Sequence, residues 1–231
     1  MTKPELSADA RHLAGMIDHT ILKPDATRHE ISKFCDEARE FGFYSVCVNS
    51  LEVAFAADRL KGSPVKVCSV IAFPFGATTS KLKVEEASDA LANGAAEIDM
   101  VIAIGALKEG RLDDVRADIE AVRAATSGAI LKVILETAML TDREKRLACQ
   151  LAQGAGADFV KTSTGYGGGG ATIADITLMR QTVGPLMGVK ASGGVRTYEA
   201  ATAMIAAGAT RIGTSSGLAI IGQTPGGSGG Y

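Results

Sequence analysis

Residues 130–162 read ILKVILETAMLTDREKRLACQLAQGAGADFVKT, and this stretch predicts a strand, a helix and a second strand. The apolar runs at 130–136 and 157–162 have the length of buried strands. Between them, Thr141 and Glu144 form a T-x-x-E capping box that marks the start of a helix. The Gly-Ala phrase that follows is typical of a helix end leading into a short loop. A strand–helix–strand unit of this size is the building block of a parallel sheet.

The same pattern recurs along the chain, where apolar runs alternate with segments of helical character. The other predicted strands are residues 14–19, 43–48, 66–72, 95–102, 187–191 and 210–213. A second capping box at Thr27 and Glu30 predicts the start of a helix. The apolar spacing of residues 80–92 predicts another helix.

Eight strands alternating with helices, without a break in composition, predict a single-domain α/β protein with a (β/α)8 TIM barrel. We assign residues 1–221 to the barrel and residues 222–231, GQTPGGSGGY, to a flexible Gly-rich C-terminal tail. An open doubly wound sheet is the alternative architecture. No GxGxxG follows the first strand, which counts against a dinucleotide-binding sheet and its cofactor.

Composition excludes several classes of protein. Hydrophobic residues make up 46 % and charged residues 22 %, as in soluble globular proteins. A formal net charge of -2 with no basic stripe argues against a nucleic-acid partner. Residues 1–15 lack the apolar core of a signal peptide, and no uncharged apolar run reaches the ~18 residues of a membrane span. The four cysteines are scattered without a CxxC pair, which favours free thiols in a reducing compartment. We therefore expect a cytoplasmic protein without a membrane partner.

Charged residues lie inside several predicted strands, although barrel strands are normally apolar on both faces. Asp99, Lys161 and Lys190 stand late in three strands, and Lys132 and Glu136 share one face of a fourth. Because a buried unpaired charge costs several kcal/mol, we expect these residues to meet one another. The carboxyl ends of barrel strands form the active site, so these side chains indicate a substrate pocket. A buried ion-pair network that only fills the barrel is the structural alternative.

Two lysines in one pocket indicate amine chemistry on a carbonyl substrate. A lysine with the ordinary pKa of about 10.4 is only ~0.1 % free amine near pH 7.4. A second ammonium nearby, together with partial desolvation, lowers that pKa. Either Lys161 or Lys190 then attacks a carbonyl to form an imine, and Asp99 is the natural proton relay. The three histidines form no HxH or HExxH pattern, so we expect no metal and no cofactor.

Glycine-rich segments follow the last predicted strands. After the strands at 187–191 and 210–213 come Gly193, Gly194, Gly213, Ser215 and Ser216. Loops at these two places in a barrel often hold a phosphate through backbone N–H groups. Either loop alone is better explained as an ordinary turn with a serine N-cap, but the presence of both favours a phosphate site. The segment GYGGGG at 165–170 either closes over the same site or is a simple turn.

Four phrases resemble the deoxyribose-phosphate aldolase family. They are IDHTILKPDAT (17–27), EIDMV (97–101), VKTSTGY (160–166) and GVKASGGVRT (188–197). The resemblance extends from about Ile17 to Gly217. It implies a (β/α)8 barrel that cleaves 2-deoxy-D-ribose 5-phosphate reversibly to acetaldehyde and D-glyceraldehyde 3-phosphate, without a cofactor. The implied partners are therefore a sugar phosphate and small aldehydes, and a homodimer is the implied assembly.

The resemblance also assigns roles to residues. It makes Lys161 the Schiff-base lysine, Lys190 the second lysine that perturbs it, and Asp99 the acid/base acting with them. It places the phosphate on Gly193, Gly194, Ser215 and Ser216, with a contribution from the loop at Gly165. It makes Cys47 a pocket residue, and Thr162, next to Lys161, is expected in the same pocket. Where the family has a basic or aromatic residue after TSTG, this chain has Tyr166, so no side-chain cation is offered there.

The lone phenol at the end of the tail suggests a proton relay at Tyr231. Nine residues of Gly/Ser-rich chain reach about 15–18 Å, which is enough to span from a barrel rim to its mouth. A disordered tail without a role is the alternative.

For the whole chain, two rival functions remain open. They are a sugar-phosphate isomerase and a non-catalytic barrel that binds a sugar phosphate.

Overall fold

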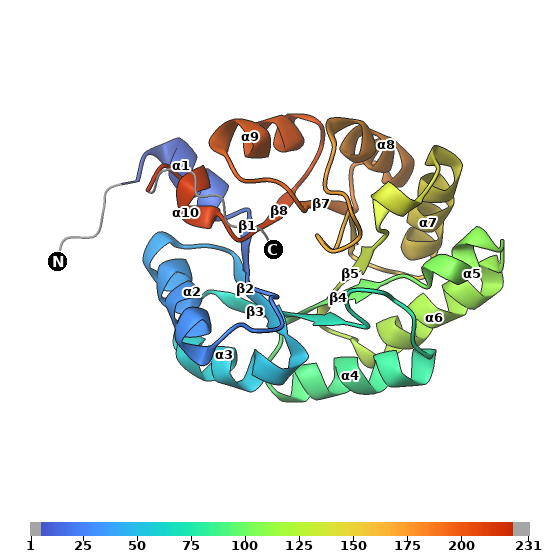
Figure 1. Cartoon of the computed structure of the whole chain (residues 1–231), viewed down its shortest axis with the longest axis horizontal. Helices are drawn as coiled ribbons and strands as arrows, with labels where there is room; N and C mark the ends of the chain where they lie inside the picture. The colour runs from blue at the N-terminus through green and yellow to red at the C-terminus, as the bar shows by residue number, and fades with distance from the viewer. Residues whose placement is uncertain (1–5, 224–231) are drawn as a thin grey trace.

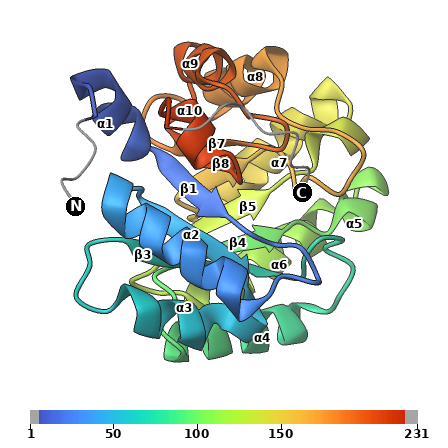
Figure 2. The same cartoon turned by 60° about the vertical axis from the view of Figure 1, so that its left-hand side comes forward.

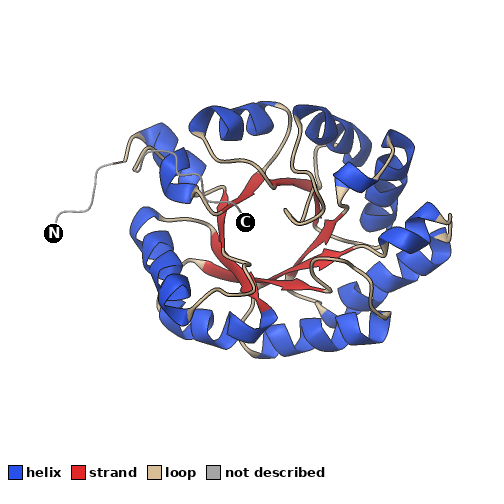
Figure 3. Ribbon diagram, viewed as in Figure 1, coloured by secondary structure: helices blue, strands red, loops and turns tan. Residues whose placement is uncertain are grey.

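The computed structural model describes residues 6–223, and their strands close into a barrel. Each strand pairs in parallel with the next, and the last pairs with the first. The strands are β1 (Ile17–Thr20), β2 (Ser45–Asn49), β3 (Lys66–Ile71), β4 (Glu97–Val101), β5 (Ile130–Ile134), β6 (Phe159–Lys161), β7 (Gly188–Ser192) and β8 (Arg211–Thr214). Figure 3 shows the ring of strands inside a ring of helices. The prediction of a (β/α)8 TIM barrel is confirmed.

Helices cover the outside of the barrel in chain order (Figure 1). They are α1 (Ala8–Ala14), α2 (Arg28–Phe41), α3 (Val53–Leu60), α4 (Ser80–Ala92), α5 (Ile104–Lys108), α6 (Leu112–Ala125), α7 (Asp142–Gly154), α8 (Ile173–Val183), α9 (Tyr198–Ala206) and α10 (Gly217–Ile220), with 3-10 turns η1 (Ser50–Glu52) and η2 (Thr137–Met139). Figure 2 shows α2 and α3 lying side by side over the outside of the sheet. No helix within residues 6–223 is long and apolar enough to cross a bilayer.

Both predicted capping boxes are present. At the start of α2, the Thr27 hydroxyl accepts from the Glu30 N–H and the Glu30 carboxylate accepts from the Thr27 N–H. Thr141 and Glu144 repeat this arrangement at the start of α7. Three loops that lead from a helix into a strand contain glycines with positive φ, as expected for a left-handed turn: Gly94, Gly156 and Gly208.

The predicted strand at residues 14–19 was placed too early. The Ser7 hydroxyl accepts from the Ala10 N–H and caps a helix that continues to Ala14, and Gly15 ends it. Strand β1 therefore starts only at Ile17. The apolar residues of this short helix and of the strand after it form one continuous run, so periodicity could not separate them.

The apolar core lies mainly between the sheet and the helices. It is a large cluster of buried aliphatic side chains, built largely from alanine, valine, leucine and isoleucine. A smaller buried cluster is formed by Leu22, Cys47, Cys68 and Val70. Much of the barrel interior is instead occupied by charged side chains, which form the candidate site.

Candidate active site

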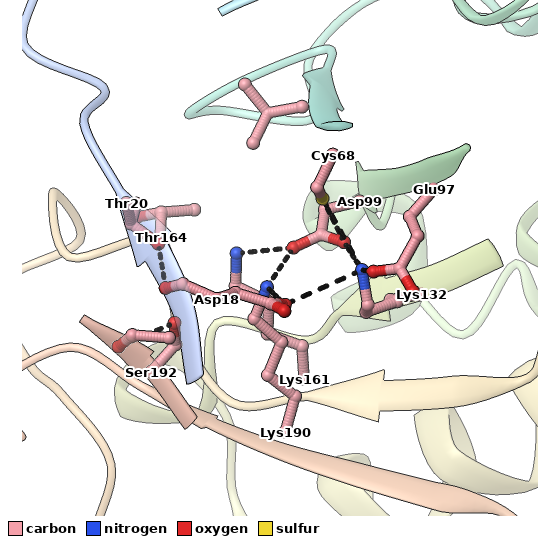
Figure 4. Close-up of polar contacts among 12 residues, drawn as sticks. Asp18, Thr20, Cys68, Glu97, Asp99, Lys132, Lys161, Thr164, Lys190 and Ser192 are labelled. Carbon is pink, nitrogen blue, oxygen red and sulfur yellow. Dashed lines mark hydrogen bonds and ion pairs between the residues drawn. The ribbon is translucent and has the colours of Figure 1, made fainter. Parts of the chain in front are cut away.

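Seven charged side chains meet inside the barrel, and we call them the barrel ion cluster. They are Asp18 on β1, Glu97 and Asp99 on β4, Lys132 on β5, Lys161 on β6, Lys190 on β7 and Arg211 on β8. Every member is buried. The barrel register brings them together, since Asp99 pairs with Lys132, and Lys161 pairs with Lys190. Six of the seven are labelled in Figure 4.

Asp99 is the centre of the cluster. Its Oδ2 accepts from Lys161 Nζ at 2.9 Å and from Lys190 Nζ at 2.8 Å, and its Oδ1 accepts from Lys132 Nζ at 2.6 Å (Figure 4). Burial alone would raise the pKa of Asp99, but the three ammonium groups outweigh burial and hold that pKa well below its usual range. The structure thus brings Asp99, Lys161 and Lys190 together, as the sequence predicted.

Asp18 and Arg211 are two members of the cluster that were not predicted from the sequence. Asp18 Oδ2 lies 2.5 Å from Lys190 Nζ, and Asp18 Oδ1 accepts from Arg211 Nη1 at 2.8 Å. Burial would lower the pKa of Lys190, but the charges of Asp18 and Asp99 raise it above its usual value. Lys132 is similarly held by Glu97, at 2.6 Å. The signal that found the other members, a charge inside a short strand, is also present in IDHT and TRIG.

Gly213 leaves room for the side chain of Lys190. A Cβ at Gly213 would lie 2.9 Å from Lys190 Cε and 2.2 Å from Ser192 Oγ. A larger residue at position 213 would therefore displace the side chains of Ser192 and Lys190. Gly213 was predicted as a phosphate-loop residue, and the structure gives it this second reason to be glycine.

The loops after β6, β7 and β8 touch one another. A Cβ at Gly170 would lie 2.4 Å from the carbonyl oxygen of Gly193, so the first two loops are in backbone contact. The Thr214 hydroxyl donates to Val195 O at 2.7 Å and accepts from the Ser216 N–H at 2.9 Å. These contacts join the three loops at the carboxyl ends of the strands. The predicted phosphate residues lie in these loops or at the end of β8: Gly165, Gly193, Gly194, Gly213, Ser215 and Ser216.

The loop after β6 is also fixed from the side of β5. Glu136 is buried, and its Oε2 accepts from both the hydroxyl and the N–H of Thr164. The Thr164 hydroxyl in turn accepts from the Tyr166 N–H at 3.0 Å. Tyr166 reaches across the barrel end, donating to Leu22 O at 3.1 Å and meeting the ring of Phe73 edge-on. Sequence reasoning placed Glu136 only on a shared strand face, because its partners lie in another loop.

Two residues predicted to line the pocket, Cys47 and Thr162, lie on or next to the strands that carry the cluster. A third predicted residue, Tyr231, lies outside the described residues. Cys47 is fully buried on β2 and pairs in register with Cys68 on β3. The Thr162 hydroxyl donates to Ser192 O at 2.9 Å and accepts from the Ser192 N–H at 3.1 Å, so it links β6 to β7. Tyr231 and most of the predicted tail lie outside residues 6–223.

Two groups of buried side chains among the described residues have ligand atoms close enough to hold a metal ion. They are Cys47, Cys68 and Asp99, and Asp18, Cys68 and Glu97, each with its ligand atoms within 4.8 Å of one another. Lys132 contacts a carboxylate in both groups, at 2.6 Å from Asp99 and 2.6 Å from Glu97. An ammonium therefore already neutralises the oxygens that a cation would need.

Comparisons with known proteins agree on one family. Residues 13–223 match the profile of the DeoC/LacD family aldolases. A deoxyribose-phosphate aldolase of Streptococcus gordonii is 61% identical over 213 residues, which are 92% of this chain and 97% of that protein. One from Enterococcus faecalis is 61% identical over 207 residues, covering 89% of this chain and 94% of that protein.

Solved structures agree with the sequence comparison. A structure from Coccidioides immitis has a TM-score of 0.89 at 45% identity, covering 96% of this chain and 87% of that one. A deoxyribose phosphate aldolase from Aeropyrum pernix, described as tetrameric, has a TM-score of 0.86 at 35% identity and covers 92% of this chain and 90% of that one.

Proposed function

This chain belongs to the DeoC/LacD family of aldolases, and on that premise we propose that it cleaves 2-deoxy-D-ribose 5-phosphate through a Schiff base on Lys161. The products are acetaldehyde and D-glyceraldehyde 3-phosphate, and the reaction is reversible. The observation that carries the assignment of residues is the meeting of Lys161 and Lys190 on one oxygen of Asp99.

The ion pairs of the barrel ion cluster single out Lys161 as the nucleophile. Lys161 forms an ion pair with Asp99 alone, whereas Lys190 and Lys132 each contact more than one carboxylate. The Lys161 nitrogen is therefore held by the fewest carboxylates of the three lysines, and a nitrogen that bonds to substrate carbon must be able to leave its ion-pair partner.

The chemistry follows from an amine next to a proton relay. Lys161 Nζ adds to C1 of the open-chain sugar, and loss of water gives the protonated imine. The imine accepts the electron pair of the C2–C3 bond while the C3 hydroxyl loses its proton, which releases D-glyceraldehyde 3-phosphate and leaves an enamine. Lys190 Nζ donates a hydrogen bond to Asp99 Oδ2 at 2.8 Å. These two residues are therefore placed to deliver the proton that converts the enamine, at C2, into the imine of acetaldehyde. Hydrolysis of the new imine frees acetaldehyde and Lys161.

We assign the phosphate to the joined loops after β7 and β8. Gly193 and Gly194 both have positive φ, which lets backbone N–H groups approach an anion. The hydroxyls of Ser215 and Ser216 add donors on the neighbouring loop. The Gly165 loop lies against the same region through Gly170.

The decisive experiment is a borohydride trap. The protein is incubated with acetaldehyde, reduced with sodium borohydride and digested for mass spectrometry. We expect an ethyl group on Lys161 that needs both reagents. Lys161→Arg, which keeps the positive charge, should carry no adduct and lose turnover by about 10³-fold or more. A folded wild-type protein without an adduct would overturn the imine and favour an isomerase or a non-catalytic binding barrel.

We extend the proposal to the oligomeric state, the cellular compartment and the C-terminal residue Tyr231. We propose a homodimer in the cytoplasm. A second copy would bury an exposed large apolar side chain such as Leu186, which is 97% exposed. Light scattering coupled to size exclusion measures the mass of the assembly directly.

For the tail, we propose that Tyr231 assists proton transfer. An unchanged turnover number after deletion of Tyr231 would refute this.

A further inference from the structure

Two thiols face each other on neighbouring strands inside the barrel. Cys47 on β2 pairs in register with Cys68 on β3, and both side chains are fully buried. Their sulfur atoms lie within 4.8 Å of each other. Adjacent strands are about 4.8 Å apart, which is inside the range of Cα separations that a disulfide spans, about 4.4–6.8 Å.

The pair also touches the centre of the barrel ion cluster. Cys68 Sγ donates to Asp99 Oδ1 at 3.2 Å and lies 3.4 Å from Lys132 Nζ (Figure 4). When the Cys68 S–H turns from Asp99 toward Cys47, this hydrogen bond lowers the pKa of the Cys47 thiol, and the charge of Lys190 acts in the same direction against burial. Burial, together with the neighbouring Cys47, raises the pKa of Cys68. Cys47 is thus the easier of the two thiols to ionise.

The other two cysteines provide the contrast. Burial raises the pKa of Cys35 to about 11 and that of Cys149 to about 12. They lie on the outer helices α2 and α7. A thiol with a raised pKa reacts slowly with peroxide, so we expect Cys47 to be oxidised before Cys35 and Cys149. Neither Cys35 nor Cys149 lies on the same element as another cysteine. Cys68, in contrast, lies beside Cys47 and can react with it once Cys47 is oxidised.

We propose that Cys47 and Cys68 form a reversible disulfide when hydrogen peroxide enters the barrel, and that this disulfide stops the aldol reaction. The Cys47 thiolate attacks one peroxide oxygen and breaks the O–O bond, giving a sulfenic acid and hydroxide. The Cys68 thiol then attacks the sulfenic sulfur and releases water. Overall, two thiols and one peroxide give one disulfide and two waters, with sulfur oxidised and peroxide reduced.

Loss of activity follows from the contacts that the bridge removes. Cys68 can no longer donate to Asp99 Oδ1, and movement of its sulfur toward Cys47 also withdraws it from Lys132. Asp99 holds Lys161 and Lys190 through its other oxygen, so its displacement disturbs both lysines. Because both strands are locked into a closed barrel, the bridge must fit a fixed register, and a disulfide formed under strain is readily reduced.

The test measures the bridge and the turnover separately. The protein is treated with one equivalent of hydrogen peroxide, denatured, alkylated with iodoacetamide and analysed by peptide mass spectrometry. We expect a cross-linked peptide pair containing Cys47 and Cys68, with alkylation confined to Cys35 and Cys149. Turnover should fall about tenfold or more and return with dithiothreitol, since small displacements of catalytic groups have effects of this size.

Two variants sharpen the result. Cys149→Ser should behave as the wild type, because Cys149 takes no part in the bridge. Cys68→Ser lacks the resolving thiol, so Cys47 should stop at a sulfenic acid that dimedone traps, and excess peroxide should inactivate it beyond rescue by dithiothreitol. Free Cys47 and Cys68 after peroxide, or a complete cross-link with undiminished turnover, would overturn the proposal. The mass of the bridge does not depend on aldolase activity, so it can be judged even if the borohydride trap fails.

Discussion

Glu136 has a left-handed backbone conformation, with φ of 58°, at the carboxyl end of β5. A non-glycine residue in this region costs of order 1–3 kcal/mol, so the surrounding contacts must compensate. They are the two hydrogen bonds from Thr164 and the close approach of Gly167, where a Cβ would lie 2.5 Å from Glu136 Cδ. The carboxylate therefore fixes the segment that follows Lys161.

Replacing that carboxylate by its amide tests this role. We expect Glu136→Gln to lower turnover about tenfold or more, because a hydrogen bond to a charged group contributes ~1.5–3 kcal/mol and 1.4 kcal/mol is a factor of ten. Steady-state kinetics on deoxyribose 5-phosphate is the measurement. Glu120→Gln on the exposed face of α6 is the matched control and should keep full activity. Equal turnover in both variants would show that the Glu136 carboxylate is not needed to position the segment after Lys161.

A methyl group at Gly213 tests the path of Lys190. We expect Gly213→Ala to displace Lys190 Cε and lower turnover by about 10²-fold, as misplacements of about 1 Å do. Gly105→Ala in α5 is the control, because its Cβ would meet nothing within 4 Å and its φ is not positive. The control should keep its activity. A crystal structure of active Gly213→Ala with Lys190 unmoved would contradict the steric argument.

Among the elements, a buried ion pair joins α4 and α6 beneath the strand that carries Asp99. Lys83 Nζ lies 2.6 Å from Asp118 Oδ2 and donates to the carbonyl oxygen of Val101, at the end of β4, at 2.9 Å. Lys83 is fully buried. Removal of one partner leaves the other charge buried and unpaired, which is the costly way to break such a pair.

The helices supply a matched comparison for this pair. We expect Lys83→Met to lower the free energy of unfolding by about 3–5 kcal/mol. Lys81→Met, two residues earlier on α4, breaks only an exposed 3.8 Å contact with Glu85 and should cost about 0.5 kcal/mol or less. Urea denaturation of the wild type and both variants measures the two losses in free energy of unfolding. A loss in Lys83→Met no larger than that in Lys81→Met would mean that α4 and α6 are held by apolar packing alone.

For the whole molecule, sequence patterns predicted what is local or strictly periodic. Capping boxes and apolar spacing located α2, α4 and α7, and charges within apolar strands located Asp99, Lys161 and Lys190. What remained hidden depends on contacts across the barrel. Tyr166 donates to Leu22, 144 residues earlier, and Arg211 meets Asp18, 193 residues earlier. Such pairs follow from the closed register, which no short window of sequence contains.

The barrel ion cluster also sets the pH range of stability. Asp18 and Asp99 have lowered pKa values, so their contribution is complete above the ordinary carboxyl pKa of about 3.9 and is lost as the pH falls through the native values. Lys132 and Lys190 have raised pKa values, so their contribution is complete below about 10.4 and is lost as the pH rises through the native values.

We therefore expect the contribution of the cluster to the free energy of unfolding to be constant between about pH 4 and 10 and to fall outside this window. Guanidinium unfolding at a series of pH values measures the profile. Each proton that a carboxylate takes up on unfolding adds up to about 1.4 kcal/mol per pH unit to the acid slope. Asp18→Asn should consequently show a shallower acid slope than the wild type. Identical slopes would show that Asp18 does not drive acid unfolding.

Because the backbones of Gly170 and Gly193 are in contact, the sequences of the loops after β6 and β7 cannot change independently of each other. A library that randomises residues 165–170 alone, in search of other acceptor aldehydes, will lose most members to collision with the neighbouring loop. Changes in length or bulk must be introduced in both loops together. Among descendants of this chain, the two segments should accordingly be inherited and exchanged as a pair, while the helices on the outer ring diverge independently.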